Sequence, residues 1–436
     1  MKSTFLYKSF LSLTFLLVTF PILTFGTRSV VTIVWSFIGI FFFFKENTSK
    51  IKLKKEIWLI LIPYFFLIIS LINSINFTEG LQYLIKMLSF VIIPIPFFLN
   101  RNIFGNQILH RIFYVFSFSI VLFVFYHIIV VFLNQDFLLQ KLTDLEIKNN
   151  GFTSIREISE EVISKIKLRR FRNYVITISN THTTYQGLWI SFAVLFFCIE
   201  FYKKKKKPIR IILFFLILVL IGWLLLISTR MPLFSLLISS IITIVIFGKI
   251  PKKKLIYIGL LGLIICSVIF SFKNPVSIRV KEYYKTGLNV LNVNSKKYEY
   301  NSSNVRNGIY YCSLKLVKNN FIFGVGIGDV QDELNNCYSD NISSNIYTWR
   351  DYNTHNQYLF FFVTSGVFGF LFFLLFLYYL INKSYKQKNF IYFYFIISVS
   401  LMFLTENILE RSDGVIFFSF FNSIFLFNNF KRRVYL

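Results

Sequence analysis

The chain has 436 residues, of which 55% are hydrophobic and only 15% are charged, and it contains 57 phenylalanines. A soluble domain has roughly a quarter of its residues charged, so this composition excludes an ordinary soluble protein and indicates a single polytopic membrane domain over residues 1–436. The net charge of +27 is no sign of nucleic-acid binding, because the basic residues stand in short clusters between apolar runs.

Apolar runs of the length needed to cross a bilayer, roughly 20 residues, predict an all-α membrane protein with about 12 transmembrane helices. The first run follows a basic start, as a signal peptide would, but no small-residue cleavage site comes after it, so it is predicted to be a span. The predicted spans are residues 9–25, 29–44, 57–73, 81–99, 112–133, 184–202, 209–228, 232–248, 255–272, 356–381, 390–405 and 414–429.

Lysines and arginines cluster on alternate connections between these spans. The short connections of the opposite set carry only Arg28, Arg230 and Arg411. The positive-inside rule then places both termini in the cytoplasm. Two long polar segments, residues 134–183 and 273–355, fall on the outer side, the second between spans 9 and 10.

Each outer segment contains an amphipathic pattern. In the first, apolar residues at helical spacing predict a helix that either lies along the membrane surface or packs on its neighbours: Ile155, Ile158, Val162, Ile163 and Ile166. In the second, an apolar stripe of Val305, Ile309, Cys312 and Leu316 predicts a helix, which the glycine-rich turn "FGVGIGD" follows.

Two further predictions concern the end of that turn and a pair of cysteines. Asp329 is predicted to cap the helix that follows the turn. Cys312 and Cys337 share the second outer segment and can pair if it faces an oxidising compartment, a condition that the spacing leaves open.

Motifs for metals and nucleotides are weak. The four histidines, His110, His127, His182 and His355, show no paired ligand spacing, so neither a metal site nor a cofactor is expected. The glycines of "FGVGIGD" follow no predicted strand and lack a P-loop lysine, which argues against nucleotide binding.

Polar residues instead gather where helices meet the outer surface. They are His182, Tyr185, Arg230, His355, Asn356, Glu406 and Arg411. The guanidinium group suits phosphate, because it donates two parallel hydrogen bonds and stays charged. No ATP is available outside the cytoplasm, so an enzyme there needs an activated substrate delivered through the membrane, and a lipid-linked pyrophosphate meets that need. His355 has a suitable pKa range for accepting a proton from a sugar hydroxyl.

Two glycines follow His355 along its predicted helix. At about 100° per residue, Gly366 returns to within about 20° of the face of His355, and Gly369 falls about 40° to the other side. Small residues let a neighbouring helix approach closely, so this stripe is predicted to pack against another helix and to fix the direction of His355.

These residues resemble the bacterial O-antigen ligases and the related O-antigen polymerases, which are polytopic inner-membrane glycosyltransferases. "HNQYLFFFVTSGVFG" is similar to the family's His and Gly signature and contains His355, Asn356, Gly366 and Gly369. "RNGIYYCSLKLVKNNFIFGVGIGD" resembles its Arg-led periplasmic helix and glycine turn, which adds Arg306. "LLLISTRMPLFSLL" and "THTTYQGLWISF" resemble further segments, so that the likeness covers mainly residues 180–430. In the first of these segments a threonine separates serine from Arg230, a departure from the adjacent pair of many relatives.

The resemblance implies a metal-independent, inverting glycosyltransferase without a cofactor. Its donor would be a glycan on undecaprenyl pyrophosphate, and its acceptor lipid A-core or another glycan. Arg230 and Arg306 would hold the pyrophosphate and His355 would activate the acceptor, while Asn356, His182, Tyr185, Arg411 and Glu406 would bind substrate on the periplasmic face of the inner membrane.

Two alternatives remain open at this stage. A polymerase that extends the lipid-linked glycan would share the fold and the donor and differ in its acceptor. A transporter or flippase without chemistry would have charged residues along a path through the membrane, where Lys86 is the clear mid-span cation.

Overall fold

The computed structural model describes residues 4–46, 55–227, 229–248, 284, 290 and 302–428. Within these residues the secondary structure is helical throughout and contains no strand, which confirms the predicted all-α class. The helices are α1 Thr4–Val18, η1 Phe20–Ile22, α2 Phe25–Glu46, α3 Lys55–Ser70, η2 Leu71–Asn73, α4 Phe77–Met87, α5 Ser89–Ile92, α6 Pro94–Leu99, α7 Asn106–Leu133, α8 Gln135–Leu139, α9 Asp144–Asn149, η3 Ile155–Glu157, α10 Glu160–Ser179, α11 Thr183–Lys203, α12 Lys207–Leu226, α13 Arg230–Phe247, α16 Ser302–Asn319, α17 Val330–Asn341, η4 Asn345–Thr348, α18 Gln357–Lys386, α19 Phe390–Met402, η5 Ile408–Glu410 and α20 Ser412–Phe427.

Eight helical segments of the described chain are long and apolar enough to cross a membrane. They are Phe25–Glu46, Lys55–Asn73, Phe77–Leu99, Asn106–Leu133, Thr183–Lys203, Lys207–Leu226, Arg230–Phe247 and Gln357–Lys386. The predicted first, eleventh and twelfth spans correspond to shorter apolar helices, and the predicted ninth span, residues 255–272, lies outside the described residues. The structure therefore supports a multi-pass membrane protein and leaves the number twelve as a prediction.

Helix α20 forms the centre of the bundle. Apart from its N-terminal Ser412, the helix is buried along its length up to Leu426, as expected of a helix that is apolar on every side. Its Phe421 lies 4.8 Å from the rings of both Phe116 and Phe192, measured between centroids. This aromatic packing brings α7, α11 and α20 together, and α12 remains at the edge with much of its apolar surface exposed.

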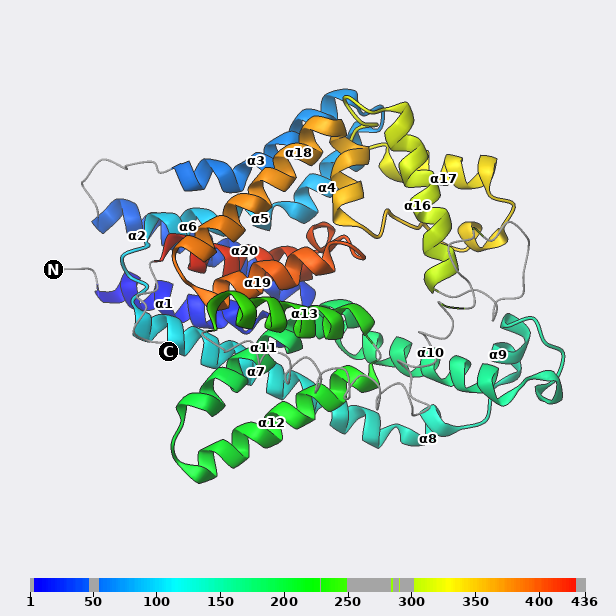
Figure 1. Cartoon of the computed structure of the whole chain (residues 1–436), viewed down its shortest axis with the longest axis horizontal. Coiled ribbons are helices and arrows are strands. Elements are labelled where there is room, and N and C mark those ends of the chain that lie inside the picture. Colours follow the sequence, from blue (N-terminus) through cyan, green and yellow to red (C-terminus); the bar gives the residue numbers. More distant parts are fainter. Residues whose placement is uncertain are drawn as a thin grey trace.

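The outer segments project from one end of the bundle, with α8, α9 and α10 on one side and α16 and α17 on the other (Figure 1). In the first segment Ile158, Val162 and Ile166 pack into a small core with Phe152, so most of the predicted apolar face packs on neighbouring residues. The prediction is wrong for Ile155, which is exposed and lies in η3 before α10 begins. In the second segment the predicted stripe is confirmed: all four of its residues are buried in a core with Leu334 and Tyr347.

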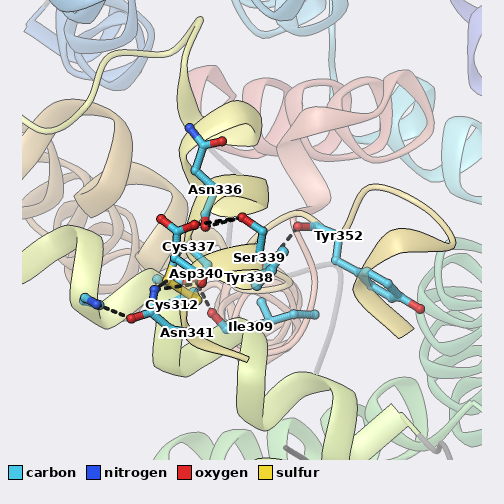
Figure 2. The surroundings of a disulfide bond; sticks show 11 residues. Ile309, Cys312, Asn336, Cys337, Tyr338, Ser339, Asp340, Asn341 and Tyr352 are labelled. Carbon is cyan, nitrogen blue, oxygen red and sulfur yellow. Dashed lines mark hydrogen bonds between the residues drawn. A yellow bond between two sulfur atoms is a disulfide. The ribbon is translucent and has the colours of Figure 1, made fainter. Parts of the chain in front are cut away.

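A disulfide joins the two helices of the second segment. Cys312 of α16 and Cys337 of α17 are bonded, with their Cα atoms 5.7 Å apart. Figure 2 shows the bond among Ile309, Tyr338 and Asn341, whose side-chain amide donates to the Cys337 carbonyl at 2.9 Å. The bond fixes α16, and with it Arg306, against α17.

The prediction of one continuous helical stripe through His355, Gly366 and Gly369 is wrong. His355 precedes α18, whose first residue is Gln357, and it has a positive φ of 44°. Gly366 interrupts the helix with φ 63° and ψ −162°, so the angular relation of an unbroken helix does not hold. Residues after the break are turned relative to those before it.

The break in α18 receives the glycine-rich turn. The amides of Val325 and Gly326 donate to the carbonyls of Val363 and Thr364 at 2.8 and 3.0 Å, and Val367 donates to Phe321 at 2.9 Å. A Cβ on Gly366 would lie 2.1 Å from the Ile322 carbonyl oxygen, so glycine is needed for this close approach as well as for the positive φ.

The expected helix-packing role needs correction at Gly366, which receives a loop. A Cβ on Gly369 would first meet Ser365 of α18 itself, and its packing against another helix stays a prediction. The prediction for Asp329 also changes: its carboxylate makes no cap to α17 but accepts from the amides of Ile75 and Asn76, both at 2.7 Å, just before α4. Asp329 thus ties the glycine turn to an early membrane helix.

Candidate active site

The loop between α19 and α20 places a carboxylate between two groups predicted from the sequence. Glu406 lies in this loop, and its Oε1 accepts from Arg306 Nη2 at 2.8 Å. Its Oε2 lies 3.4 Å from His355 Nδ1. Arg306 also donates from Nη2 to the Thr405 carbonyl at 3.1 Å. Segments about 100 residues apart in the sequence therefore meet at Glu406.

Hydrogen bonds hold the backbone of His355 in its left-handed conformation, which is uncommon for a residue with a side chain. The His355 amide donates to Asn353 Oδ1 at 3.2 Å, and Asn353 Nδ2 donates to Glu410 Oε2 at 2.8 Å. Neighbouring Thr354 exchanges hydrogen bonds with the side chain of Asn407. Because this network is largely buried, the imidazole is held on a fixed backbone at the outer end of α18.

Two predicted substrate-binding residues are engaged in local contacts. Asn356 Oδ1 accepts from the amides of Tyr358 and Leu359, and its Nδ2 donates to the Leu404 carbonyl at 3.1 Å, so Asn356 caps α18. Tyr185 is 3% exposed, and its hydroxyl donates to the Asn407 carbonyl at 3.2 Å. Both residues contact the loop that carries Glu406, which gives them a positioning role.

The charge of Glu406 is strongly stabilised. Burial by itself would raise the pKa of this carboxyl, but the interaction with His355 and the positive charge of Arg306 outweigh it and lower the pKa to about 2. Glu406 is therefore ionised throughout the physiological range, and its Oε2 faces the imidazole of His355.

His182 has the opposite response to the same surroundings. Burial lowers its pKa to about 4, and the positive charges of Arg172, Arg411 and His355 act in the same direction, against the favourable charge of Glu406. Its Nδ1 accepts from the Thr184 amide at 3.4 Å, which caps α11. His182 is therefore neutral near pH 7 and contributes a polar group rather than a charge.

Arg172 belongs to this charge cluster and was missed by the sequence reasoning. It lies on α10 in the first outer segment, donates from Nη2 to Thr183 Oγ1 at 3.0 Å, and has a buried Nε without a hydrogen-bond partner. Burial, together with the positive charges of Arg230 and Arg306, lowers its pKa to about 10. The stretch "LRRFR" mixes three arginines, and the sequence contains no signal for which of them turns towards the site.

The two remaining predicted arginines lie at helix starts around the same cluster. Arg230 begins α13 and interacts electrostatically with Arg172. Arg411 is the exposed N-cap residue of α20, and its charge reaches His182 and Glu410. Four arginines are thus arranged around one ionised glutamate, Glu406, which leaves a net positive charge suited to a polyanionic group.

A second buried carboxyl, Glu410, lies behind His355. Burial raises its pKa to about 7, partly offset by hydrogen bonds from Asn353 and Asn407 and by the charges of Arg411 and Lys86. Glu410 was also not predicted, because an acidic residue directly before an arginine in the sequence is typical of an exposed ion pair. Among the described residues no group of three His, Cys, Asp or Glu side chains is placed to hold a metal ion.

Comparison with known proteins gives one family. The family model described as O-antigen ligase matches residues 216–374. The matched region contains Arg230, Arg306 and His355 together with the glycine turn and the break in α18. No curated protein matches the chain. The match supports an O-antigen ligase or polymerase family assignment for residues 216–374, which belong to a multi-pass helical structure.

Proposed function

We propose that this protein is an O-antigen ligase. It moves a glycan from undecaprenyl pyrophosphate to lipid A-core on the periplasmic face of the bacterial inner membrane. The observation that carries the proposal is the pairing of Glu406 with both Arg306 and His355 inside a cluster of further arginines. The disulfide between Cys312 and Cys337 supports an oxidising compartment for the same segment.

The arginines bind the pyrophosphate of the donor. Within the described residues, Arg306 donates its hydrogen bonds through Nη2 alone. Its Nη1 and Nε can therefore donate to phosphate oxygens. Arg172 offers its unpartnered Nε, and Arg230 adds positive charge beside it. As the bond between the sugar and the pyrophosphate breaks, negative charge grows on the leaving group, and fixed guanidinium groups stabilise that charge without rearrangement.

His355 acts on the acceptor. Nδ1 carries the ring proton and faces Glu406 Oε2 at 3.4 Å, so that Nε2 can take the proton of the acceptor hydroxyl. The hydroxyl oxygen then forms a bond to the anomeric carbon from the side opposite the departing pyrophosphate, which inverts that centre. The distance of 3.4 Å is longer than an ordinary hydrogen bond and is expected to shorten when the acceptor is in place.

The decisive experiment is the glycolipid profile of a deletion strain complemented with variants. A ligase deletion accumulates lipid-linked polymer and leaves lipid A-core unmodified. Wild type restores capped lipopolysaccharide, and a normally inserted His355→Ala protein does not. Single repeat units attached to the core in the deletion strain would contradict the ligase function. They would favour the alternative, a polymerase that extends the lipid-linked glycan.

A purified assay separates enzyme from transporter. The protein in detergent micelles is mixed with lipid-linked glycan and lipid A-core, a format in which no compartment boundary exists. Formation of the glycosylated core requires catalysis. If wild-type protein that complements the deletion strain does not form it in this assay, the proposal is overturned. Full transfer by His355→Ala would remove the role given to this residue.

A further inference from the structure

An open cavity of about 480 Å³ lies where α11 ends and α12 begins. Its lining residues are Phe201, Lys205, Lys207, Arg210, Ile211 and Phe214. Helix α11 starts at Thr183 beside the arginine cluster, and its 21 residues span about 30 Å, so the cavity lies at the opposite membrane surface. In Figure 1 the turn between α11 and α12 lies at the lower left, far from α10 and α16.

The cavity carries positive charge that described residues do not neutralise. It has three cationic side chains and no acidic one in its lining. The acidic residue of this helix end, Glu200, is already bound by His110, Tyr114, Lys203 and Lys204. Lys205, Lys207 and Arg210 form no ion pair with any residue in the described part of the chain.

The floor of the cavity is apolar and organised. The guanidinium of Arg210 lies over the ring of Phe201, 4.6 Å from its centroid, and the rings of Phe201 and Phe214 are 6.4 Å apart. In a run of solvated lysines the cations would lie in water, whereas stacking on Phe201 holds the guanidinium of Arg210 against the apolar floor of the cavity.

Apolar surface continues from the cavity along α12. Ile211, Ile212, Phe214, Phe215 and Leu218 are each more than half exposed, on a helix that is long and apolar enough to cross the membrane. Acyl chains would cover this surface. The cationic cavity and the acyl-facing surface therefore meet at the depth where a phospholipid has its phosphate.

We propose that this cavity binds the headgroup of an anionic phospholipid of the surrounding bilayer. The lysines and Arg210 contact the phosphate, Phe201 and Phe214 contact the glycerol region, and the acyl chains lie along α12. A soluble anion would use the same cations but would gain nothing from the apolar floor. The proposal does not depend on the glycosyltransferase function, because the cavity and the arginine cluster lie at opposite ends of α11.

Native mass spectrometry of the full-length protein in detergent tests the proposal, with phosphatidylglycerol and phosphatidylcholine as probes. Phosphatidylglycerol should bind, and a variant with Lys205→Gln, Lys207→Gln and Arg210→Gln should bind it roughly tenfold to a hundredfold more weakly. The matched control carries Lys206→Gln, Lys386→Gln and Lys388→Gln, which removes equal charge outside the cavity and should retain binding.

Three results would overturn the proposal: equal binding of the two lipids, equal loss in the control, or displacement of phosphatidylglycerol by soluble glycerol phosphate at similar concentration. A photoactivatable phosphatidylglycerol gives an independent reading on the unaltered protein, which matters if the triple variant does not fold. Crosslinks should map to residues 201–214, and a map without them would equally reject the site.

Discussion

The two outer segments each bring an arginine towards Glu406, and they hold it by different means. In the second segment, α16 carries Arg306 and is fixed by the disulfide, by its own apolar core and by the pairing of the glycine turn with α18. In the first segment, α10 carries Arg172 and is fixed by a smaller apolar core and by an ion pair, in which Arg170 Nε donates to Glu146 Oε1 at 2.8 Å, and no disulfide reinforces it.

The comparison separates structural from functional arginines on one helix. Arg170 donates to Glu146 and to the carbonyls of Phe137, Leu138, Gln140 and Lys141, so its donors serve the fold. Arg172, two residues later, points to a different side of α10 and interacts with the charges of the candidate site. One support with a disulfide and one without therefore converge on one carboxylate.

Glu406 is where the charges of both supports meet, so its replacement should have the largest effect. Glu406→Gln keeps the shape but removes the charge that pairs with Arg306 and orients His355. We expect glycan transfer to fall by about 100-fold or more, measured with purified protein at saturating donor.

The matched control for Glu406 is Glu79→Gln, at a half-buried position in the first turn of α4. It should transfer normally. Activity of Glu406→Gln within about twofold of wild type would mean that the charge is not used by His355.

Lysine substitutions compare the two supports directly. Lysine keeps the charge and loses the planar fork, so Arg306→Lys should lower transfer by about tenfold to a hundredfold. Arg172→Lys should have a smaller effect, about tenfold, because its less constrained segment lets lysine adjust. The rate at limiting donor concentration measures both.

Arg156→Lys, in the exposed part of the first segment, serves as the control for these substitutions. A larger loss for Arg172→Lys than for Arg306→Lys would reverse the proposed order of the two supports.

The disulfide accounts for part of the difference in rigidity. Cys312→Ser with Cys337→Ser removes a bond with a sequence separation of 25, and bonds that close loops of about this size stabilise folds by about 3 kcal/mol. We expect a lower unfolding temperature and greater protease sensitivity of α16 and α17, while the first segment remains protected.

Cys198→Ala is the control, since Cys198 is the free cysteine among the described residues. If thiol labelling of unreduced wild type modifies Cys312 or Cys337, the bond is absent in the isolated protein and this source of rigidity is excluded.

The smallest expected effect concerns Glu410, which supports His355 through Asn353. Its folded pKa of about 7 lies above the ordinary value of 4.5, so the folded state keeps a proton that the unfolded state loses. Its contribution to stability is complete below pH 4.5 and is lost as the pH rises to about 7. Glu410→Gln should therefore unfold at a temperature a few degrees higher than wild type at pH 8, with a smaller difference at pH 5.

Thermal unfolding in detergent across this pH range measures the difference between the two proteins. The charges of Arg411 and Lys86 act on Glu410 and lower its pKa. A difference independent of pH would show that Glu410 does not titrate in the folded protein between these values.

Much of the membrane architecture could be predicted because hydrophobic length is a local property. The apolar runs located the helices to within a few residues, and the periodicity of Val305, Ile309, Cys312 and Leu316 identified a buried face. His355 and Glu406 could be placed near one surface because each lies where a predicted span begins or ends, and the family resemblance added Arg306 to them. The distances between these three residues could not be predicted, because they depend on packing between segments that are far apart in the sequence.

The sequence by itself determined the membrane class, the approximate spans and the polar residues at helix ends, since solvation by lipid acts on each run separately. The tertiary structure alone decided that Gly366 breaks α18 to receive the glycine turn, that Asn356 caps a helix, and that Arg172 rather than Arg170 turns towards the site. The physical reason is that backbone pairing and buried charge depend on partners from other segments, which no local pattern specifies.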